Sequence, residues 1–257
     1  MNRVELIETW KQEEQRPFAG WDFAYLKGRM IEERPPWDYM ARAAELMPRA
    51  ASVLDMGTGG GERLLSLREY WPAKVAVTED YPPNVKLARE RLGPLGVRVE
   101  DVELSRTALM PFADGEFDLV LNRHSSLNCA EVARVLAPGG VFLTQQVHSL
   151  WAQDLIAEFG ATPPWPEDTP DYYLPRLEAA GLLTKTTEEW QGKLTFTDVG
   201  AVVFYLKAIP WLVPGFSVAT HLDSLQRFQQ RLEAGQALTF AARLYWIEAR
   251  KPGGSGE

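Results

Sequence analysis

The residues whose types and spacing most clearly suggest a chemical function form a glycine-rich turn directly after a short apolar run. Residues 53–62 read VLDMGTGGGE, so the acidic Asp55 stands two positions before the first glycine, Gly57. Glycine adopts positive φ easily and lets a ligand approach the backbone closely. A strand, a turn of this kind and a helix typically bind a ligand at the carboxyl edge of an open α/β sheet. The pattern therefore predicts a ligand site, and its residues are Asp55, Gly57, Thr58, Gly59 and Gly61.

The turn does not fit the two common phosphate-binding motifs. A dinucleotide fingerprint needs a third glycine where this chain has Glu62, and no Lys-Ser or Lys-Thr pair follows as in a P-loop. A pyrophosphate also disfavours an acid such as Asp55 beside the turn. An acid there suits a ligand with positive charge. S-adenosylmethionine has an amino group and a sulfonium, so its polarity matches.

Further acids follow at the ends of the next apolar runs. Glu79 stands 24 residues after Asp55 (79 − 55), where an acidic side chain can take both hydroxyls of a ribose. Asp80, the next residue, is the alternative for this role, and we prefer Glu79. Asp101 ends the third run, where it could accept a hydrogen bond from an adenine amino group, with the Val102 backbone beside it.

The elements that must position these residues alternate between short apolar runs and helical patterns. Strand-like runs lie near residues 52–56, 74–80, 97–103, 117–122, 140–147, 184–196 and 238–251. Such alternation predicts a parallel sheet with right-handed crossovers. We expect an α/β, Rossmann-like fold: a seven-stranded, mostly parallel sheet with helices on both faces, an N-terminal arm and a helical cap insertion.

The fourth run ends in Asn122-Arg123-His124, which we place beside the ligand. We assign Asn122 to cofactor binding and His124 and Arg123 to catalysis. His124 could act as a general base, since its ordinary pKa lies near neutrality, or it could pack on the ligand or cap the next helix. Arg123 could bind a carboxylate or phosphate, or make a structural ion pair. Of Gln145 and Gln146, only one should face the site, because neighbours on a strand alternate.

Aromatic residues are dense near the N-terminus, in residues 16–39. Aromatic rings can stabilise a sulfonium by cation–π contact, although they could equally pack the arm onto the body. Tyr25 and Arg29 are four apart and would share a helix face. The substrate-binding candidates are Trp21, Tyr25, Arg29, Trp37 and Trp211.

Four pieces of the chain, in order and spacing, resemble the class I S-adenosylmethionine-dependent methyltransferases of the small-molecule type. They are VLDMGTGGG (53–61), VTEDYPPNVKLARERL (77–92), MPFADGEFDLVLNRHSS (110–126) and EVARVLAPGGVFLTQQV (131–147). The segment between Asp101 and Pro111 is longer than the family's usual loop. The chain ends also look like an uncharacterised bacterial subgroup of this family. The resemblance implies S-adenosylmethionine as cofactor, S-adenosylhomocysteine as product and a methyltransferase activity.

Composition limits the classes of methyl acceptor, the metal content and the cellular location that we expect. The chain has 257 residues, 27 Lys plus Arg, 35 Asp plus Glu, and a net charge of −8, which speaks against nucleic-acid binding. One cysteine, Cys129, and three histidines offer no metal cluster or zinc module, so we expect no metal. No secretory signal or membrane span is visible, and we expect a cytoplasmic monomer or homodimer.

These observations combine into one division of the chain and one leading function. We expect an arm over 1–48, a methyltransferase domain over 49–257 (a cofactor half at 50–148 and a cap-bearing substrate half at 149–251), and a flexible tail at 252–257. The leading function is methyl transfer to a small-molecule acceptor by in-line displacement. The alternatives are an RNA (rRNA or tRNA) or protein methyltransferase and a non-catalytic S-adenosylmethionine-binding module.

Overall fold

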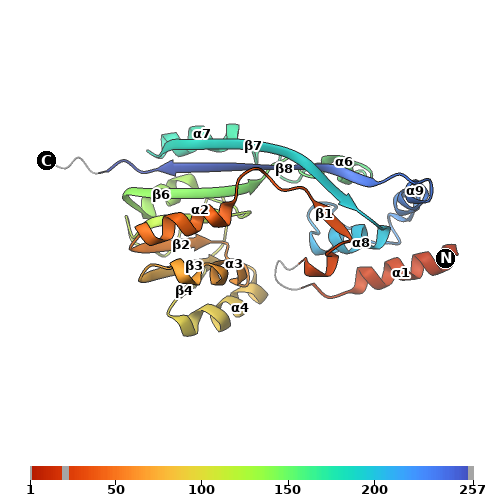
Figure 1. The fold of residues 1–257 in the computed structure, drawn as a ribbon, viewed down its shortest axis with the longest axis horizontal. Helices are drawn as coiled ribbons and strands as arrows, with labels where there is room; N and C mark the ends of the chain where they lie inside the picture. Colours follow the sequence, from red (N-terminus) through yellow and green to blue (C-terminus); the bar gives the residue numbers. More distant parts are fainter. Residues whose placement is uncertain (1, 19–22, 254–257) are drawn as a thin grey trace. The chain divides into compact units, whose positions relative to one another are not determined.

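The structure is a computed structural model, and it describes residues 2–18 and 23–253 (Figure 1). The described strands form an eight-stranded sheet in the order β1-β7-β8-β6-β5-β2-β3-β4. Their bounds are β1 Met30–Glu32, β2 Ser52–Met56, β3 Lys74–Glu79, β4 Arg98–Asp101, β5 Phe117–Arg123, β6 Leu136–Val147, β7 Leu183–Phe196 and β8 Leu238–Arg250.

The helices alternate with the strands through the first half of the chain and cluster in the second. The α-helices are α1 Arg3–Gln15, α2 Tyr39–Leu46, α3 Glu62–Ser66, α4 Pro82–Leu92, α5 Cys129–Val135, α6 Gln153–Ala157, α7 Pro170–Ala179, α8 Val199–Ala208 and α9 Leu222–Glu233. Short 3-10 helices lie at Ala24–Leu26, Met47–Arg49, Arg68–Tyr70 and Gly93–Leu95.

The chain forms two compact units, each built from several segments. Unit 1 contains residues 1–35, 148–167 and 190–243, and unit 2 contains residues 36–147, 168–189 and 244–257. β7 and β8 each contribute residues to both units. The predicted division into an arm, a methyltransferase domain and a tail stays a prediction, and residues 254–257 of that tail lie outside the described residues.

Unit 2 is built on a parallel sheet. β2 pairs in parallel with β3 and β5, β3 with β4, and β5 with β6, while β8 pairs antiparallel with β6. Val53 and Leu54 are both fully buried although they point to opposite faces. Side chains of both faces are buried because helices cover the two sides, which explains the continuous apolar runs in the sequence.

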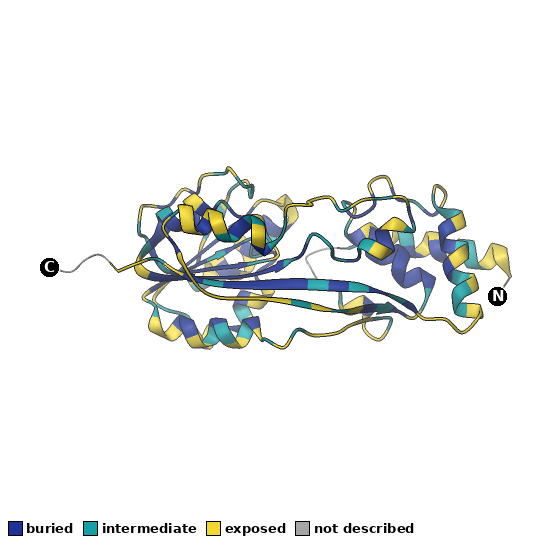
Figure 2. Cartoon of the chain, turned by 90° about the horizontal axis from the view of Figure 1, so that it is seen from above, coloured by how far each residue is buried: buried dark blue, intermediate teal, exposed yellow. Residues whose placement is uncertain are grey.

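The two faces of this sheet carry separate hydrophobic clusters. Leu54, Val120 and Phe142 share one cluster with residues of α5 and α7. Val53, Leu119 and Leu121 share the other with residues of α2, α3 and α4. The inner strands accordingly appear dark blue in Figure 2. The predicted α/β fold with helices on both faces is confirmed.

The predicted number of strands was too low by one. The additional strand, β1, lies in the segment expected to be an arm, and it pairs antiparallel with β7 through Met30 and Phe196. Three residues between Arg29 and Glu33 carry too short a pattern to predict a strand, and pairing with β7 is what orders them. β6 also begins earlier than predicted, at Leu136, because that residue pairs with Phe117 of β5.

Unit 1 has its own core around α8, which is buried along nearly its whole length. α1 and α9 both pack on α8. Trp10 of α1 and Phe228 of α9 are buried in the same cluster as Phe204 of α8. Asn2 begins α1 with a capping box that includes Glu5, which satisfies the first free N–H groups of that helix.

Within 2–18 and 23–253, the helices lack the combination of length and apolar character that a membrane crossing needs. In the same residues, His, Cys, Asp and Glu side chains do not gather in a group of three or more that could hold a metal ion.

Candidate functional site

The glycine-rich turn joins the carboxyl end of β2 to α3, as predicted. Gly57, Gly59 and Gly61 have φ values of 66°, 65° and 82°, in the left-handed region that favours glycine. A Cβ at Gly57 would lie 2.4 Å from Ser125 Oγ, and one at Gly61 would lie 2.9 Å from Leu92 Cγ. Both the backbone conformation and the space therefore require glycine at these positions.

Glu79 fixes the position of this turn from the end of β3. Its Oε2 accepts a hydrogen bond from Gly59 N at 2.6 Å, and its Oε1 accepts from Asp80 N at 3.2 Å and Tyr81 N at 3.1 Å. The side chain is buried, and desolvation raises its pKa despite these hydrogen bonds. A carboxylate accepts about four hydrogen bonds, so acceptor capacity remains for a ligand.

Asp55 is the second acid of the site. Desolvation raises its pKa from the usual 3.8 to about 6, and the negative charge of Glu79 adds to this rise. The guanidinium of Arg123 opposes it. A carboxylate held in an environment that disfavours its charge gains most from a cationic partner, so a ligand with a positive group fits the site.

Three buried polar atoms beside these acids have no hydrogen-bond partner among the described residues. They are Nδ2 of Asn122, the hydroxyl of Tyr39 and Oγ1 of Thr58. The Oδ1 of Asn122 accepts from Thr144 Oγ1 at 3.1 Å and from Gln146 Nε2. Burying a polar group without a partner is costly. Such groups next to a glycine turn therefore point to a polar ligand.

His124 follows β5 and has an unusual backbone conformation, with φ at 57°. Its backbone N donates to Gln145 O at 2.9 Å, and its Nε2 lies 3.1 Å from Gln145 Nε2. Gln145 Oε1 accepts from Trp37 Nε1 at 2.8 Å. Trp37, Gln145 and His124 thus form a continuous chain of hydrogen-bonding groups. Gln146 points to Asn122 instead, as the alternation along a strand predicts.

Arg123 lies near several of these groups. Its charge lowers the pKa of Tyr39 and of Asp55, although desolvation raises both overall. Desolvation lowers the pKa of His124 well below its ordinary value, and the charges of Arg123 and Arg63 lower it further. Each of these effects favours the neutral form of the His124 imidazole.

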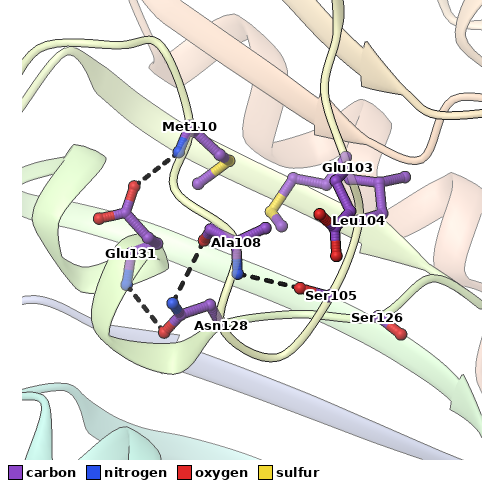
Figure 3. Close-up of a pocket in the computed structure, with 9 residues that line it drawn as sticks. Glu103, Leu104, Ser105, Ala108, Met110, Ser126, Asn128 and Glu131 are labelled. Carbon is purple, nitrogen blue, oxygen red and sulfur yellow. Dashed lines mark hydrogen bonds between the residues drawn. The ribbon is translucent and has the colours of Figure 1, made fainter.

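A small, partly open pocket lies next to the turn (Figure 3). The close-up shows Glu103 and Leu104 facing the loop that carries Ala108 and Met110. Its lining residues are Met56, Glu103, Leu104, Ser105, Ala108, Met110, Ser126, Asn128 and Glu131. None of these residues is predicted from the sequence as part of the site, and the segment that follows Asp101, which contributes most of them, carries no motif.

The acids predicted near the third strand have different surroundings. Asp80 Oδ2 accepts from Leu104 N at 3.1 Å, which ties the pocket loop to the end of β3. Asp101 is exposed and lies 4.0 Å from Arg89 Nη2. Val102 N donates to Glu79 O at 3.1 Å. The adenine-binding role of Asp101 and Val102 stays a prediction.

The predicted substrate-binding residues fall in both units. Trp21 lies outside the described residues. In unit 1, the Tyr25 hydroxyl donates to Glu13 at 2.9 Å, and Arg29 donates to Asp198 at 2.9 and 2.6 Å. Arg29 Nη2 also lies 3.1 Å from Glu13 Oε1, and its guanidinium is 5.2 Å from the centre of the Tyr25 ring, so the two side chains meet. They do not share a helix face as predicted, because the 3-10 helix that holds Tyr25 ends at Leu26. Trp211 is also in unit 1, with its ring 6.0 Å from that of Trp165. The roles of these residues stay predictions.

A scan against protein families matches residues 54–144 to a family described as "Methyltransferase domain". This stretch contains the glycine turn, the acid at the end of β3 and most of β5 and β6. It is the same part of the chain that carries the resemblance in the sequence.

Two curated relatives are demethylmenaquinone methyltransferases. That of Thermus thermophilus is 38% identical over 45% of this chain and 56% of its own length. That of Deinococcus radiodurans is 33% identical over 40% of this chain and 46% of its own length. The chain therefore spans about half the length of the curated relatives that it matches.

The fold itself has solved counterparts. A Bacillus halodurans protein described as a candidate methyltransferase superimposes with a TM-score of 0.58. It covers 83% of this chain and 98% of its own length at 19% identity. At this identity the likeness shows a common fold.

Proposed function

Because residues 54–144 match the family described as "Methyltransferase domain", we propose that the chain is a class I S-adenosylmethionine-dependent methyltransferase, which transfers a methyl group from this cofactor to a small-molecule acceptor. The observation that carries the proposal is the site around Asp55. A desolvated carboxylate, a turn with three glycines at positive φ and three unpartnered polar groups gather at the carboxyl ends of β2 and β5. This set fits a ligand that carries both cationic and polar groups.

Each residue of the site has a role in this proposal. Asp55 offers its carboxylate to the cationic end of the cofactor. Glu79 holds Gly59 in place and has acceptor capacity left for ribose hydroxyls. Asn122 Nδ2 and the Tyr39 hydroxyl supply hydrogen bonds toward the ligand. The pocket lined by Glu103, Leu104 and Met110 is the place for the adenine ring.

When bound, S-adenosylmethionine supplies a methyl carbon on a positively charged sulfur, which leaves as a neutral thioether as the acceptor's electron pair forms the new bond. The chain's own contribution is positioning and the exclusion of water. Arg123 and His124, at the end of β5, hold the acceptor. Neither has to form a covalent bond, so a catalytic pair of carboxylates is not required.

Two observations support a small-molecule acceptor. The net charge of −8 disfavours a nucleic-acid substrate, whose binding needs a basic surface. The relatives named as demethylmenaquinone methyltransferases suggest an aromatic acceptor of the naphthoquinol type. A cytoplasmic location and a monomeric or dimeric state belong to the same proposal.

Cofactor binding is tested first by isothermal titration calorimetry. We expect S-adenosylmethionine and S-adenosylhomocysteine to bind and NAD not to bind. Asp55→Ala should abolish this binding, whereas the matched control Glu90→Ala, an exposed acid on α4, should leave it unchanged. Binding of NAD alone, or equal effects of the two substitutions, would contradict the proposal.

The acceptor is tested with a methyl-labelled cofactor and a panel of reduced naphthoquinols, phenols, amines and carboxylates. We expect label to enter a small molecule. Transfer to rRNA, tRNA or a protein, with none to the panel, would favour the alternative acceptors. Tight cofactor binding without any transfer would favour a non-catalytic binding module.

A further inference from the structure

The side chain of Gln145 lies between two other side chains of unit 2, and both contacts are at hydrogen-bond distance. Trp37 Nε1 is 2.8 Å from Gln145 Oε1, and His124 Nε2 is 3.1 Å from Gln145 Nε2. Trp37 precedes α2, His124 follows β5 and Gln145 lies near the end of β6. Three elements of the same unit therefore build this arrangement.

The indole of Trp37 determines which groups donate and which accept in the hydrogen bonds among Trp37, Gln145 and His124. A tryptophan Nε1–H can only donate, so the atom that faces it must be the amide oxygen of Gln145. The amide nitrogen of Gln145 then faces His124, and an amide nitrogen can only donate. His124 Nε2 must consequently accept, which leaves the ring proton of the neutral imidazole on Nδ1.

The surroundings of His124 agree with this single protonation state. A doubly protonated ring would point an N–H at the amide hydrogens of Gln145, and it would lie near the guanidinium groups of Arg123 and Arg63. Both effects disfavour the cation. Among the described residues, Nδ1 of His124 has no hydrogen-bond partner, while the side chain is solvent-accessible.

The backbone at His124 is held by the same glutamine. A φ of 57° is uncommon for a residue other than glycine, and the bond from His124 N to Gln145 O at 2.9 Å holds it. Gln145 thus sets the position of the backbone through its carbonyl and the orientation of the ring through its side chain.

We propose that His124 donates a hydrogen bond from Nδ1 to an oxygen of the methyl acceptor, and that Gln145 and Trp37 are positioning residues that keep the proton on that nitrogen. This rests on the proposed methyltransferase function. With Arg123 as the neighbouring cation, the acceptor class is one with a phenolate or enolate oxygen. Such an acceptor is already ionised, so the transfer itself requires no proton removal and His124 has no role as a base.

The ring tautomer is measured by two-dimensional 15N–1H NMR of the imidazoles, with and without S-adenosylhomocysteine. The chain has three histidines, so the spectrum of His124→Asn identifies the His124 signals by their loss. We expect the pattern of a neutral ring protonated at Nδ1 between about pH 6 and 8. A ring protonated at Nε2, or at both nitrogens, would overturn the proposal.

Contact with the acceptor oxygen is measured by titrating the protein with 4-nitrophenolate and, as the matched ring without the phenolic oxygen, nitrobenzene. We expect 4-nitrophenolate alone to shift the Nδ1 proton of His124. An equal shift with both compounds, or no shift with either, would contradict donation to an oxygen. This readout does not need turnover, so its result is separate from success or failure of the proposed function.

Two substitutions of His124 distinguish a role as hydrogen-bond donor from a role as general base. Asparagine carries an N–H near the place of Nδ1, tolerates positive φ and cannot take up a proton. We expect His124→Asn to keep methyl transfer within about threefold, and His124→Ala to lose tenfold or more. Equal losses in both variants would show that His124 acts as a base.

Gln145→Glu tests the positioning residues. A glutamate at this position accepts from Trp37 and also from His124, so it draws the ring proton to Nε2. We expect the Nδ1 signal and the shift with 4-nitrophenolate to disappear while S-adenosylhomocysteine still binds. An unchanged tautomer in this variant would show that Gln145 has no influence on the proton.

Discussion

Asp55, a residue of the proposed cofactor site, lowers the stability of the folded protein. Its folded-state pKa of about 6 lies above the usual 3.8, because the site desolvates the carboxylate. Between these values the folded state binds more protons than the unfolded chain, so the residue lowers stability as pH rises from about 4 to 6. The cost remains at every higher pH.

We expect Asp55→Asn to raise the free energy of unfolding at pH 7.5 by up to about 3 kcal/mol, which corresponds to two pKa units. Below pH 4 the two proteins should have equal stability. Urea denaturation at several pH values measures the difference. While stability rises in Asp55→Asn, affinity for the cofactor should be lost in this variant. In the wild type, affinity should weaken below pH 6. A variant that is less stable at pH 7.5 would refute the assigned desolvation.

Gly57 gives a second prediction at the residue scale. Gly57→Ala should cost more than backbone strain, since its Cβ would collide with Ser125. Gly96→Ala is the matched control, because Gly96 also has positive φ, at 84°, but its Cβ would meet no atom within 4 Å. We expect about 1 kcal/mol of destabilisation for Gly96→Ala, and 2 kcal/mol or more together with loss of cofactor binding for Gly57→Ala. Thermal unfolding and calorimetry compare the two, and similar results would mean that Ser125 moves aside easily.

The sequence predicts some residues of the site well and others poorly, for a physical reason. The positions of Asp55, the three turn glycines and Glu79 follow from local order along one strand–turn–helix unit. The pocket residue Glu103 and the pair of Trp37 with Gln145 depend on segments far apart in the chain. No local pattern encodes such contacts, which arise only when the strands are aligned in the sheet.

At the scale of elements, the loop that lines the pocket is attached to α5 by the charge pair of Glu131 and Arg134, beside a hydrogen bond from Asn128 Nδ2 to Ala108 O. Glu131 accepts from Met110 N at 2.8 Å and binds Arg134 through both oxygens. Arg134 also donates to the carbonyl oxygens of Met110 and Phe112. Hydrogen bonding to Arg134 lowers the pKa of Glu131. The stabilisation is therefore present above the usual pKa and is lost as pH falls through the lowered value.

We expect Glu131→Gln to lower the free energy of unfolding by about 2 kcal/mol at pH 7, since it leaves Arg134 with the exposed Asp114 as its remaining ionic partner. The difference from the wild type should shrink as the solution is acidified. Affinity for S-adenosylhomocysteine should fall as well, because the loop around Met110 lines the pocket. Denaturation and calorimetry measure both, with Glu90→Gln as the exposed control. A variant with lower stability but full affinity for S-adenosylhomocysteine would show that this loop does not take part in cofactor binding.

Elements with long patterns were easier to predict than those that depend on a neighbour. The buried strands β2, β3 and β5 follow from apolar runs closed by turn residues. β1 has three residues, and the first residues of β6 include Pro138 and two glycines. These stretches become strands because an existing partner strand offers them hydrogen bonds, which no propensity scale registers.

At the scale of the whole molecule, charge decides between classes of acceptor. With 27 basic and 35 acidic residues, the net charge is −8. We expect filter binding to retain less than a tenth of labelled rRNA or tRNA at 10 µM protein and 50 mM salt, since low salt favours phosphate contacts most. Saturable retention that weakens steeply with salt would reveal a local basic surface and revive the RNA alternative.

The course of β8 through both units has a consequence for how the protein is made. Residues 238–243 of this strand belong to unit 1 and residues 244–250 to unit 2, where they pair with β6. Neither unit can therefore acquire its last strand until β8 has been synthesised, well after β2 to β6. Until then the side of β6 that pairs with β8 is exposed, and it must remain soluble or be shielded by a chaperone.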